Sequence, residues 1–186
     1  IIDLPRAIVT VGNGVLKNYI IYVEDASRAK AIAVQSSQLL TQVSEGQVVR
    51  ITGKLDKTGV QPVLKATTIS LVGGSDGAFA QDTPLAPVAT TSKSIAGVGL
   101  DATALLFKFY GKVTPVNDEY FCIDDGSGAT DGMGNAGVPV LINEQLTPLT
   151  PPTGNQATVT GVVAKKDLGG GVVSVIIPRS QDDITE

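Results

Sequence analysis

Two pairs of adjacent acidic residues are the first side chains in this sequence whose type and spacing could do chemistry. Glu24 stands beside Asp25, and Asp124 stands beside Asp125, each pair directly after an apolar stretch. Two carboxylates can hold a cation or act as a general acid and base, but neighbouring residues on a strand point to opposite faces. We therefore interpret each pair as the end of a strand and the beginning of a polar turn.

The loop that follows the second pair has the oxygen and glycine content of a calcium loop. Residues 124–132 read DDGSGATDG, but they lack the alternating acidic order and the distal Glu of an EF-hand. With no His and the single Cys122, the chain cannot build a zinc cluster of thiolates and imidazoles, a Ser-His-Asp triad or a Cys-His pair. We expect no enzyme activity, catalytic residue, metal or cofactor, and we leave open whether the loop from Asp124 to Asp131 holds a cation.

Charge and aromatic content limit the ligands that the chain could bind. It has a net charge of −4, 4 Tyr, 4 Phe and no Trp, whereas binding a nucleic-acid single strand requires a cationic groove and stacking aromatics. Residues 1–72 hold 8 Lys or Arg and 5 Asp or Glu, a balance of +3, and residues 73–186 hold 6 and 13, a balance of −7. A nucleic-acid partner is disfavoured for the whole chain, although the first part alone could attract a polyanion.

A glycan is the other candidate ligand, because sugar rings stack on aromatic platforms. Tyr22, Tyr110 and Tyr120 are the candidate ligand-binding tyrosines, besides Tyr19. Two or more of these rings on one exposed face would support a glycan-binding role.

The sequence contains an internal repeat that organises these residues. Residues 20–25 match residues 120–125, residues 31–34 match 137–140, and residues 49–53 match 157–161. The three blocks keep their order, and their offsets of 100, 106 and 108 grow only through insertions in loops. We infer two copies of one β-rich unit.

Each copy is predicted to hold about five short strands. The first strand is expected at residues 7–11 and 107–113, the second ends at the acidic pair, the third ends at Val34 or Val140, and two longer strands follow. Residues 38–43 carry a short apolar helical face, and five strands with a small helix after the third is the order of the OB-fold. Gly169 to Gly171 lie between two apolar stretches and predict a hairpin turn, not a phosphate cradle. The predicted fold is all-β, with two tandem five-stranded OB-fold-like Greek-key barrels and short helical turns.

At this level the chain resembles tandem OB-fold-like repeat proteins, which are largely uncharacterised and are secreted or surface-exposed in environmental bacteria. The resemblance rests on residues 22–25 with 31–34 in the first copy, and on residues 120–128, 159–161 and 177–179 in the second. It covers nearly the whole chain. It implies an exported protein, at the cell surface or extracellular, and it carries over no catalytic residue.

The stretch between the copies is rich in Gly, Ala, Ser, Thr and Pro. This composition is typical of a flexible linker, but we expect residues 73–106 to be an ordered connection that lies against the repeats, with residues 100–105 forming one helical turn. The predicted domains are therefore residues 1–72, the connection 73–106, and residues 107–186.

The N-terminal segment carries three large apolar residues, Ile1, Ile2 and Leu4, before the first predicted strand. It could add a strand to the sheet edge of a neighbouring copy or fold back onto its own chain. No apolar run approaches the ~18 residues of a membrane span, so we expect no membrane insertion. The leading hypothesis is a non-enzymatic extracellular structural protein whose partners are copies of itself, assembled head to tail into filaments or a surface layer. An OB module that binds an oligosaccharide or a nucleic-acid single strand is the alternative.

Overall fold

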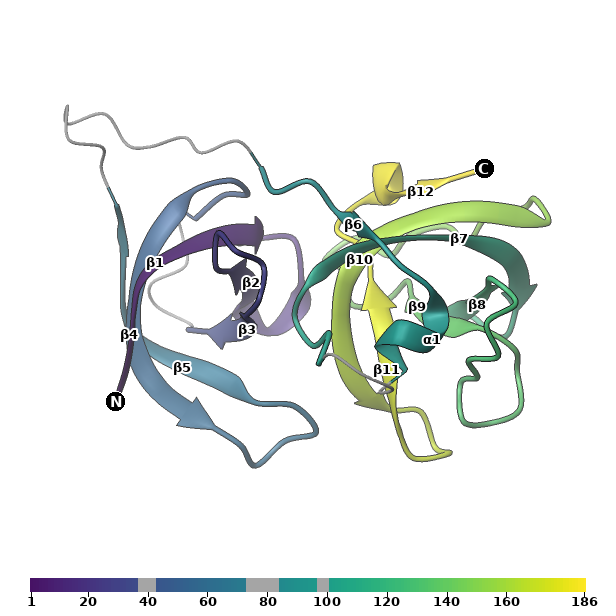
Figure 1. The fold of residues 1–186 in the computed structure, drawn as a ribbon, viewed down its shortest axis with the longest axis horizontal. Coiled ribbons are helices and arrows are strands. Elements are labelled where there is room, and N and C mark those ends of the chain that lie inside the picture. The colour runs from purple at the N-terminus through teal and green to yellow at the C-terminus, as the bar shows by residue number, and fades with distance from the viewer. Residues whose placement is uncertain (37–42, 73–83, 97–100) are drawn as a thin grey trace. The chain divides into compact units, whose positions relative to one another are not determined.

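The chain folds into two compact units, residues Ile1–Ala86 and Pro87–Glu186. The structure is a computed structural model that describes residues 1–36, 43–72, 84–96 and 101–186. Figure 1 shows that strands dominate both units, so the prediction of an all-β protein is confirmed. No helix among the described residues is long and apolar enough to cross a membrane.

The first unit is a closed barrel of five strands, in which neighbours pair in the order β1-β2-β3-β5-β4 and β4 returns to β1. All pairs are antiparallel except β3 with β5, which is parallel. A single turn, η1 (Lys17–Tyr19), leads into β2. The strands are β1 (Ile2–Val11), β2 (Ile20–Glu24), β3 (Ala31–Gln35), β4 (Val48–Asp56) and β5 (Val63–Leu71).

The second unit is a seven-stranded sheet with the order β12-β10-β11-β9-β8-β7-β6. Because β10 also pairs with β7, the strands β7, β8, β9, β11 and β10 follow one another as β1, β2, β3, β5 and β4 do in the first unit. The elements are β6 (Val88–Ala89), α1 (Ser92–Ile95), β7 (Leu106–Pro115), β8 (Tyr120–Asp124), β9 (Val138–Leu141), β10 (Gln156–Asp167), β11 (Val172–Ile177), η2 (Gln181–Asp183) and β12 (Ile184–Thr185).

Equivalent residues of the two copies hold equivalent places in the two cores. Val9 pairs with Val23 between β1 and β2, as Val113 pairs with Ile123 between β7 and β8. The same correspondence continues across the parallel pairs, where Val34 lies opposite Leu64 and Val140 lies opposite Ile176. The apolar alternation of the strands therefore fills both interiors by one scheme. The equivalent buried pairs are Val9 and Val113, Ile21 and Phe121, Val23 and Ile123, Val34 and Val140, and Leu64 and Ile176.

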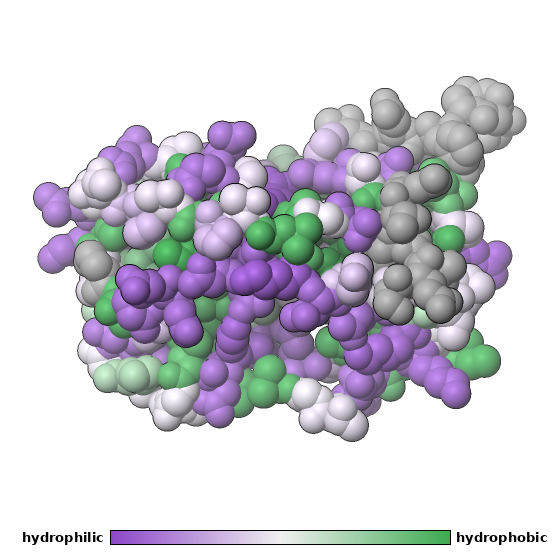
Figure 2. All heavy atoms as spheres, turned by 180° about the vertical axis from the view of Figure 1, so that it is seen from behind, coloured by the Kyte–Doolittle hydropathy of each residue, from purple (hydrophilic) through white to green (hydrophobic). Residues whose placement is uncertain are grey.

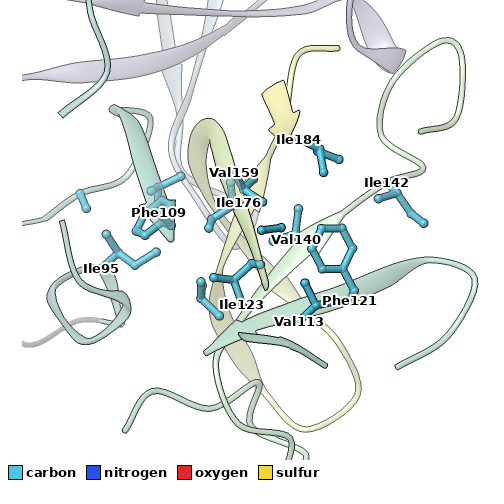
Figure 3. Close-up of a cluster of buried hydrophobic side chains, with 14 residues drawn as sticks. Ile95, Phe109, Val113, Phe121, Ile123, Val140, Ile142, Val159, Ile176 and Ile184 are labelled. Atoms are coloured by element: carbon cyan, nitrogen blue, oxygen red, sulfur yellow. The ribbon is translucent and has the colours of Figure 1, made fainter. Parts of the chain in front are cut away.

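The core of the second unit contains the larger side chains. Figure 3 shows Phe109 from β7 and Phe121 from β8 among aliphatic residues that converge from β8, β9, β10 and β11. Ile95 of α1 and Ile184 of β12 belong to the same cluster. The short helix and the last strand therefore cover this core. The two strands beyond the five predicted for each copy are β6, which pairs with β7, and β12, which pairs with β10.

Several predicted boundaries need correction. The first strand begins at Ile2 and not at residue 7, and its counterpart begins at Leu106. The helical face predicted at residues 38–43 lies outside the described residues except for Val43, as do residues 73–83 and 97–100 of the connection. The described residues 101–105 contain a turn and no helix, whereas a helix occurs at Ser92–Ile95. The turn predicted at Gly169 to Gly171 is confirmed, with Gly169 and Gly171 at φ of 96° and 110°.

Candidate ligand-binding surface

The four tyrosines divide into two buried and two exposed side chains. Tyr22 and Tyr120 are each only 2% exposed, whereas Tyr19 is 61% and Tyr110 is 59% exposed. Gln61 donates a hydrogen bond to the Tyr22 hydroxyl over 3.4 Å, and the Tyr120 hydroxyl donates to Asp131. The hypothesis that Tyr22 and Tyr120 are stacking platforms is wrong, because neither ring has a free face. Only Tyr110 of the three candidates is left.

The exposed Tyr19 stands on an unusual backbone at the start of β2. Asn18 and Tyr19 are consecutive residues with positive φ, 61° and 55°. Asn tolerates this left-handed conformation, but an aromatic residue adopts it at a steric cost. The loop is fixed by Gln35 of β3, whose Nε2 donates to the Asn18 carbonyl oxygen at 2.9 Å. Strained backbone of this kind concentrates at ligand-binding and other functional sites.

Lysines gather beside this loop because of the strand pairing. Gln35 pairs with Lys65 between β3 and β5, and the Lys65 ammonium contacts the Gln35 amide oxygen. Lys54 of β4 lies opposite Lys65 on the same sheet, so two like charges are cross-strand neighbours, an arrangement that costs free energy without a counterion. We call Lys17, Tyr19, Gln35, Lys54 and Lys65 the basic loop surface.

One carboxylate borders the basic loop surface. Asp56 lies 3.9 Å from the Lys65 ammonium, between the Asp56 Oδ2 and the Lys65 Nζ. Hydrogen bonds from the Thr58 hydroxyl and backbone, together with the charge of Lys65, hold the pKa of Asp56 below its usual range. Asp56 is therefore ionised at neutral pH and only partly offsets the positive charge of this surface.

The second unit carries the opposite charge at the equivalent loop. Asn117, Asp118 and Glu119 precede β8 where Lys17, Asn18 and Tyr19 precede β2. Leu141, which pairs with Tyr120 as Gln35 pairs with Ile20, replaces the amide. The basic loop surface thus belongs to the first unit alone. The sequence signal that could have found it is this difference between the aligned copies.

Each acidic pair lies where its strand ends and a turn begins, as predicted. Glu24 is buried and its Oε2 lies 3.2 Å from the Arg28 Nε. The Asp25 carboxylate accepts hydrogen bonds from the backbone N–H groups of Ala29 and Lys30. In the second unit, the carboxylates equally accept from nearby backbone N–H groups: Asp124 from Gly126, and Asp125 from Ser127 and from Ser92 of α1.

Asp131 organises the loop that was a candidate cation site. Its side chain is fully buried and accepts hydrogen bonds from the Met133 and Asn135 backbone, the Asn135 amide and the Tyr120 hydroxyl. Burial would raise the pKa of Asp131, but these hydrogen bonds outweigh burial and hold it below the usual range. Among the described residues no group of three or more His, Cys, Asp or Glu is arranged to hold a metal.

Two further groups near this loop have strongly raised pKa values. Burial, followed by the hydrogen bond to Asp131 and its charge, raises the pKa of Tyr120 to about 12. Burial, followed by the charges of Asp131 and Asp124, raises the pKa of Cys122 to about 12. At neutral pH both groups are protonated, so Cys122 is a buried thiol and not a nucleophilic thiolate.

The N-terminal residues proposed for self-association lie mostly within the first barrel. Ile2 and Leu4 pack against its core, and they pair with Gly53 and Ile51 of β4. The Asp3 carboxylate binds the Arg50 guanidinium through two hydrogen bonds of 3.1 and 2.7 Å. Folding back onto the chain is therefore the alternative that the structure shows, and only Ile1, 99% exposed, is left for a neighbour.

No protein-family model matches the chain, and no curated protein matches it either.

Proposed function

We propose that this chain is a non-enzymatic binding protein whose two units are OB-fold-like barrels, and that its basic loop surface binds an acidic oligosaccharide. The pairing order β1-β2-β3-β5-β4 supports the OB-like assignment. In OB-folds, ligands bind across the second and third strands and the loops beside them. Tyr19 and Gln35 lie at that place in the first unit.

The single observation that carries the proposal is an exposed aromatic ring held by strained backbone beside lysines. Tyr19 offers its ring to a sugar, Gln35 offers an amide, and Lys54 and Lys65 offer ammonium groups to carboxylates or sulfates. A ligand that places negative charge between Lys54 and Lys65 would relieve their repulsion. The same ligand would offset the backbone cost at Asn18 and Tyr19.

A sugar chain suits this surface better than a nucleic-acid single strand does. One exposed tyrosine on this surface cannot stack a series of bases. A sugar chain can instead be held by one stacked ring together with hydrogen bonds to its hydroxyl groups. The resemblance to secreted repeat proteins supports an extracellular or cell-surface location, where such glycans occur.

Isothermal titration calorimetry of the full chain with an alginate hexamer, an oligomer of uronic acids, tests the proposal. Tyr19→Ala and Lys65→Gln should each weaken binding by about five- to tenfold, or roughly 1 to 1.4 kcal/mol. Lys30→Gln is the matched control, because Lys30 is an exposed lysine at the opposite end of β2. Equal binding of neutral dextran, tighter binding of oligothymidine, or unchanged binding by Tyr19→Ala would contradict the proposal.

Head-to-tail self-association is a second candidate function, favoured by one observation. The equivalent loops before β2 and β8 carry Lys17 in one unit and Asp118 with Glu119 in the other. The basic loop of one copy could therefore meet the acidic loop of the next, a heterologous contact that need not close into a ring.

A further inference from the structure

Strand β7 of the second unit presents a second combination of an aromatic ring and lysines. Lys108, Tyr110 and Lys112 alternate with the buried Phe109 and Val113, so the three point outward on one face of the strand. All three side chains are exposed. At about 3.4 Å per residue, the two lysine Cα atoms lie ~14 Å apart, with Tyr110 midway between them.

The neighbouring strand β10 supplies polar partners for this face. Gln156 pairs with Lys112, and Thr158 pairs with Tyr110. The Tyr110 hydroxyl donates a hydrogen bond to Gln156 Oε1, and both side chains are exposed. We call Lys108, Tyr110, Lys112, Gln156 and Thr158 the β7 face.

The two lysines stand out in a unit that is otherwise acidic. Residues 87–186 contain 6 Lys or Arg and 11 Asp or Glu. Lys166 and Arg179 are ion-paired with Glu144 and Asp183, whereas in the described part of the chain neither Lys108 nor Lys112 has a carboxylate within ion-pair distance. Lys108 and Lys112 thus place positive charge on both sides of Tyr110.

Two carboxylates in this part of the unit have hydrogen-bond partners of their own. Asp124 of β8 lies opposite Lys112, and its Oδ1 accepts the Gly126 N–H. Glu186, beyond β12, accepts hydrogen bonds from the Thr153 backbone and hydroxyl. Figure 2 shows one face of the molecule, on which hydrophobic side chains are scattered among hydrophilic ones.

We propose that the β7 face is a second site for an acidic glycan, with one sugar ring stacked on Tyr110 and anionic groups of flanking sugars bound by Lys108 and Lys112. Gln156 and Thr158 would bind sugar hydroxyls. This inference rests on the proposed function for its ligand class, but it uses a different surface. A glycan long enough to contact both sites would bind more tightly than one that contacts a single site.

The first unit does not repeat the β7 face. Its corresponding strand β1 has Pro5 and Arg6 at a register shift between Leu4 and Ala7, where the pairing with β4 is interrupted. Regular alternation of Lys, Tyr and Lys is therefore found on β7 and not on β1. The two units therefore differ on this outer face, although equivalent residues fill their two separate cores.

Nuclear magnetic resonance of the ¹⁵N-labelled full chain, titrated with the alginate hexamer, separates the two sites. We expect amide shift changes at residues 108–112 and 156–158, which Tyr110→Ala removes and Tyr19→Ala leaves in place. Lys108→Gln with Lys112→Gln should reduce the affinity of these shifts by at least about tenfold, as the loss of two charged contacts implies. Lys93→Gln, an exposed lysine on α1, is the control.

Each outcome decides one of the two proposals. Shifts confined to residues 17–19, 35, 54 and 65 would overturn the β7 face and leave the proposed function intact. Shifts confined to the β7 face would overturn the basic loop surface and support the second site. Equal shifts with neutral dextran, or no shifts at all, would overturn both. Circular dichroism of each variant checks that the sheets are folded, and the lysine pair tests the face without disturbing the Tyr110 ring.

Discussion

Asp131 is the residue that holds the long loop between β8 and β9 against the sheet. Its buried carboxylate joins the Tyr120 hydroxyl to the Asn135 amide and to two backbone N–H groups. A buried acceptor with all its donors in place stabilises, and removal of one partner leaves the others unsatisfied. The loop therefore depends on one ionised side chain.

Asp131→Asn should lower the free energy of unfolding by about 1 to 3 kcal/mol at neutral pH, because the amide offers a donor where Tyr120 and Asn135 need an acceptor. The pKa of Asp131 is lowered in the folded protein, so its stabilisation is present above about pH 4 and is lost as the pH falls through the folded-state pKa. The difference between the natural protein and the variant should shrink on acidification, as measured by urea unfolding at pH 7 and pH 3. Asp182→Asn, at an exposed position, is the control; a difference independent of pH would contradict this role.

Individual side chains were the hardest part to predict from sequence. Alternation along a strand tells which residues share a face, but not whether a loop covers the outer face. Tyr120 points away from the core cluster and is still buried, because it binds Asp131 in the loop that follows β8. Tyr19 is exposed because of a local left-handed backbone that no periodicity reveals. Only Tyr110, on a strand face without such a loop, followed the prediction of exposure.

At the scale of elements, β4 and β10 each contain a glycine at the equivalent position, where close packing of the strands leaves no room for a side chain. Gly53 and Gly161 end the matched blocks of the repeat. A Cβ on Gly161 would lie 2.7 Å from the Ile177 carbonyl oxygen, and one on Gly53 would overlap the Lys65 carbonyl oxygen. The two strands cross their neighbours at the same place in each unit, where no side chain fits.

Gly161→Ala should destabilise the second unit and Gly53→Ala the first, each by about 1 to 3 kcal/mol, because backbone must move to admit the methyl group. Gly59→Ala, in the turn between β4 and β5, should change stability by less than ~0.5 kcal/mol because its Cβ would meet nothing closer than 3.7 Å. Thermal unfolding followed by circular dichroism measures all three. An unchanged midpoint for Gly53→Ala and Gly161→Ala would show that the strands are not this closely packed.

Strands could be predicted where the sequences of the two copies match. The blocks at residues 20–25 and 120–125 became β2 and β8, and the blocks at 49–53 and 157–161 lie within β4 and β10. The short helix Ser92–Ile95 was missed because its stretch is rich in Gly, Ala and Ser and has little helical periodicity of its own. Ile95 becomes helical through burial in the core of the second unit and through a hydrogen bond from Ser174 to its carbonyl oxygen, both of which are tertiary contacts.

For the whole molecule, the uneven charge predicts an association that depends on salt. Residues 1–72 carry a net charge of +3 and residues 73–186 a net charge of −7. If the first part of one copy binds the second part of another, the weight-average sedimentation coefficient should rise with protein concentration at low salt. It should fall to the monomer value at about 0.5 M salt, where charges are screened within a few ångströms. Glu119→Gln should weaken association more than Asp182→Asn, which removes the same charge elsewhere. A monomer at every concentration in low salt would exclude head-to-tail assembly by charge.

The closure of the first barrel by β1 and β4 has a consequence for the time course of folding. Ile2 pairs with Gly53 and Ile8 with Val48. The first strand therefore cannot form this pairing until β4 has been synthesised. The hairpin of β2 and β3 joins residues close in sequence and can form early. Because contacts between distant residues slow folding, we expect barrel closure to be the late and rate-limiting step of the first unit. Until then Ile2 and Leu4 are exposed, and during this time β1 of a newly synthesised chain can pair with a strand of a neighbouring chain.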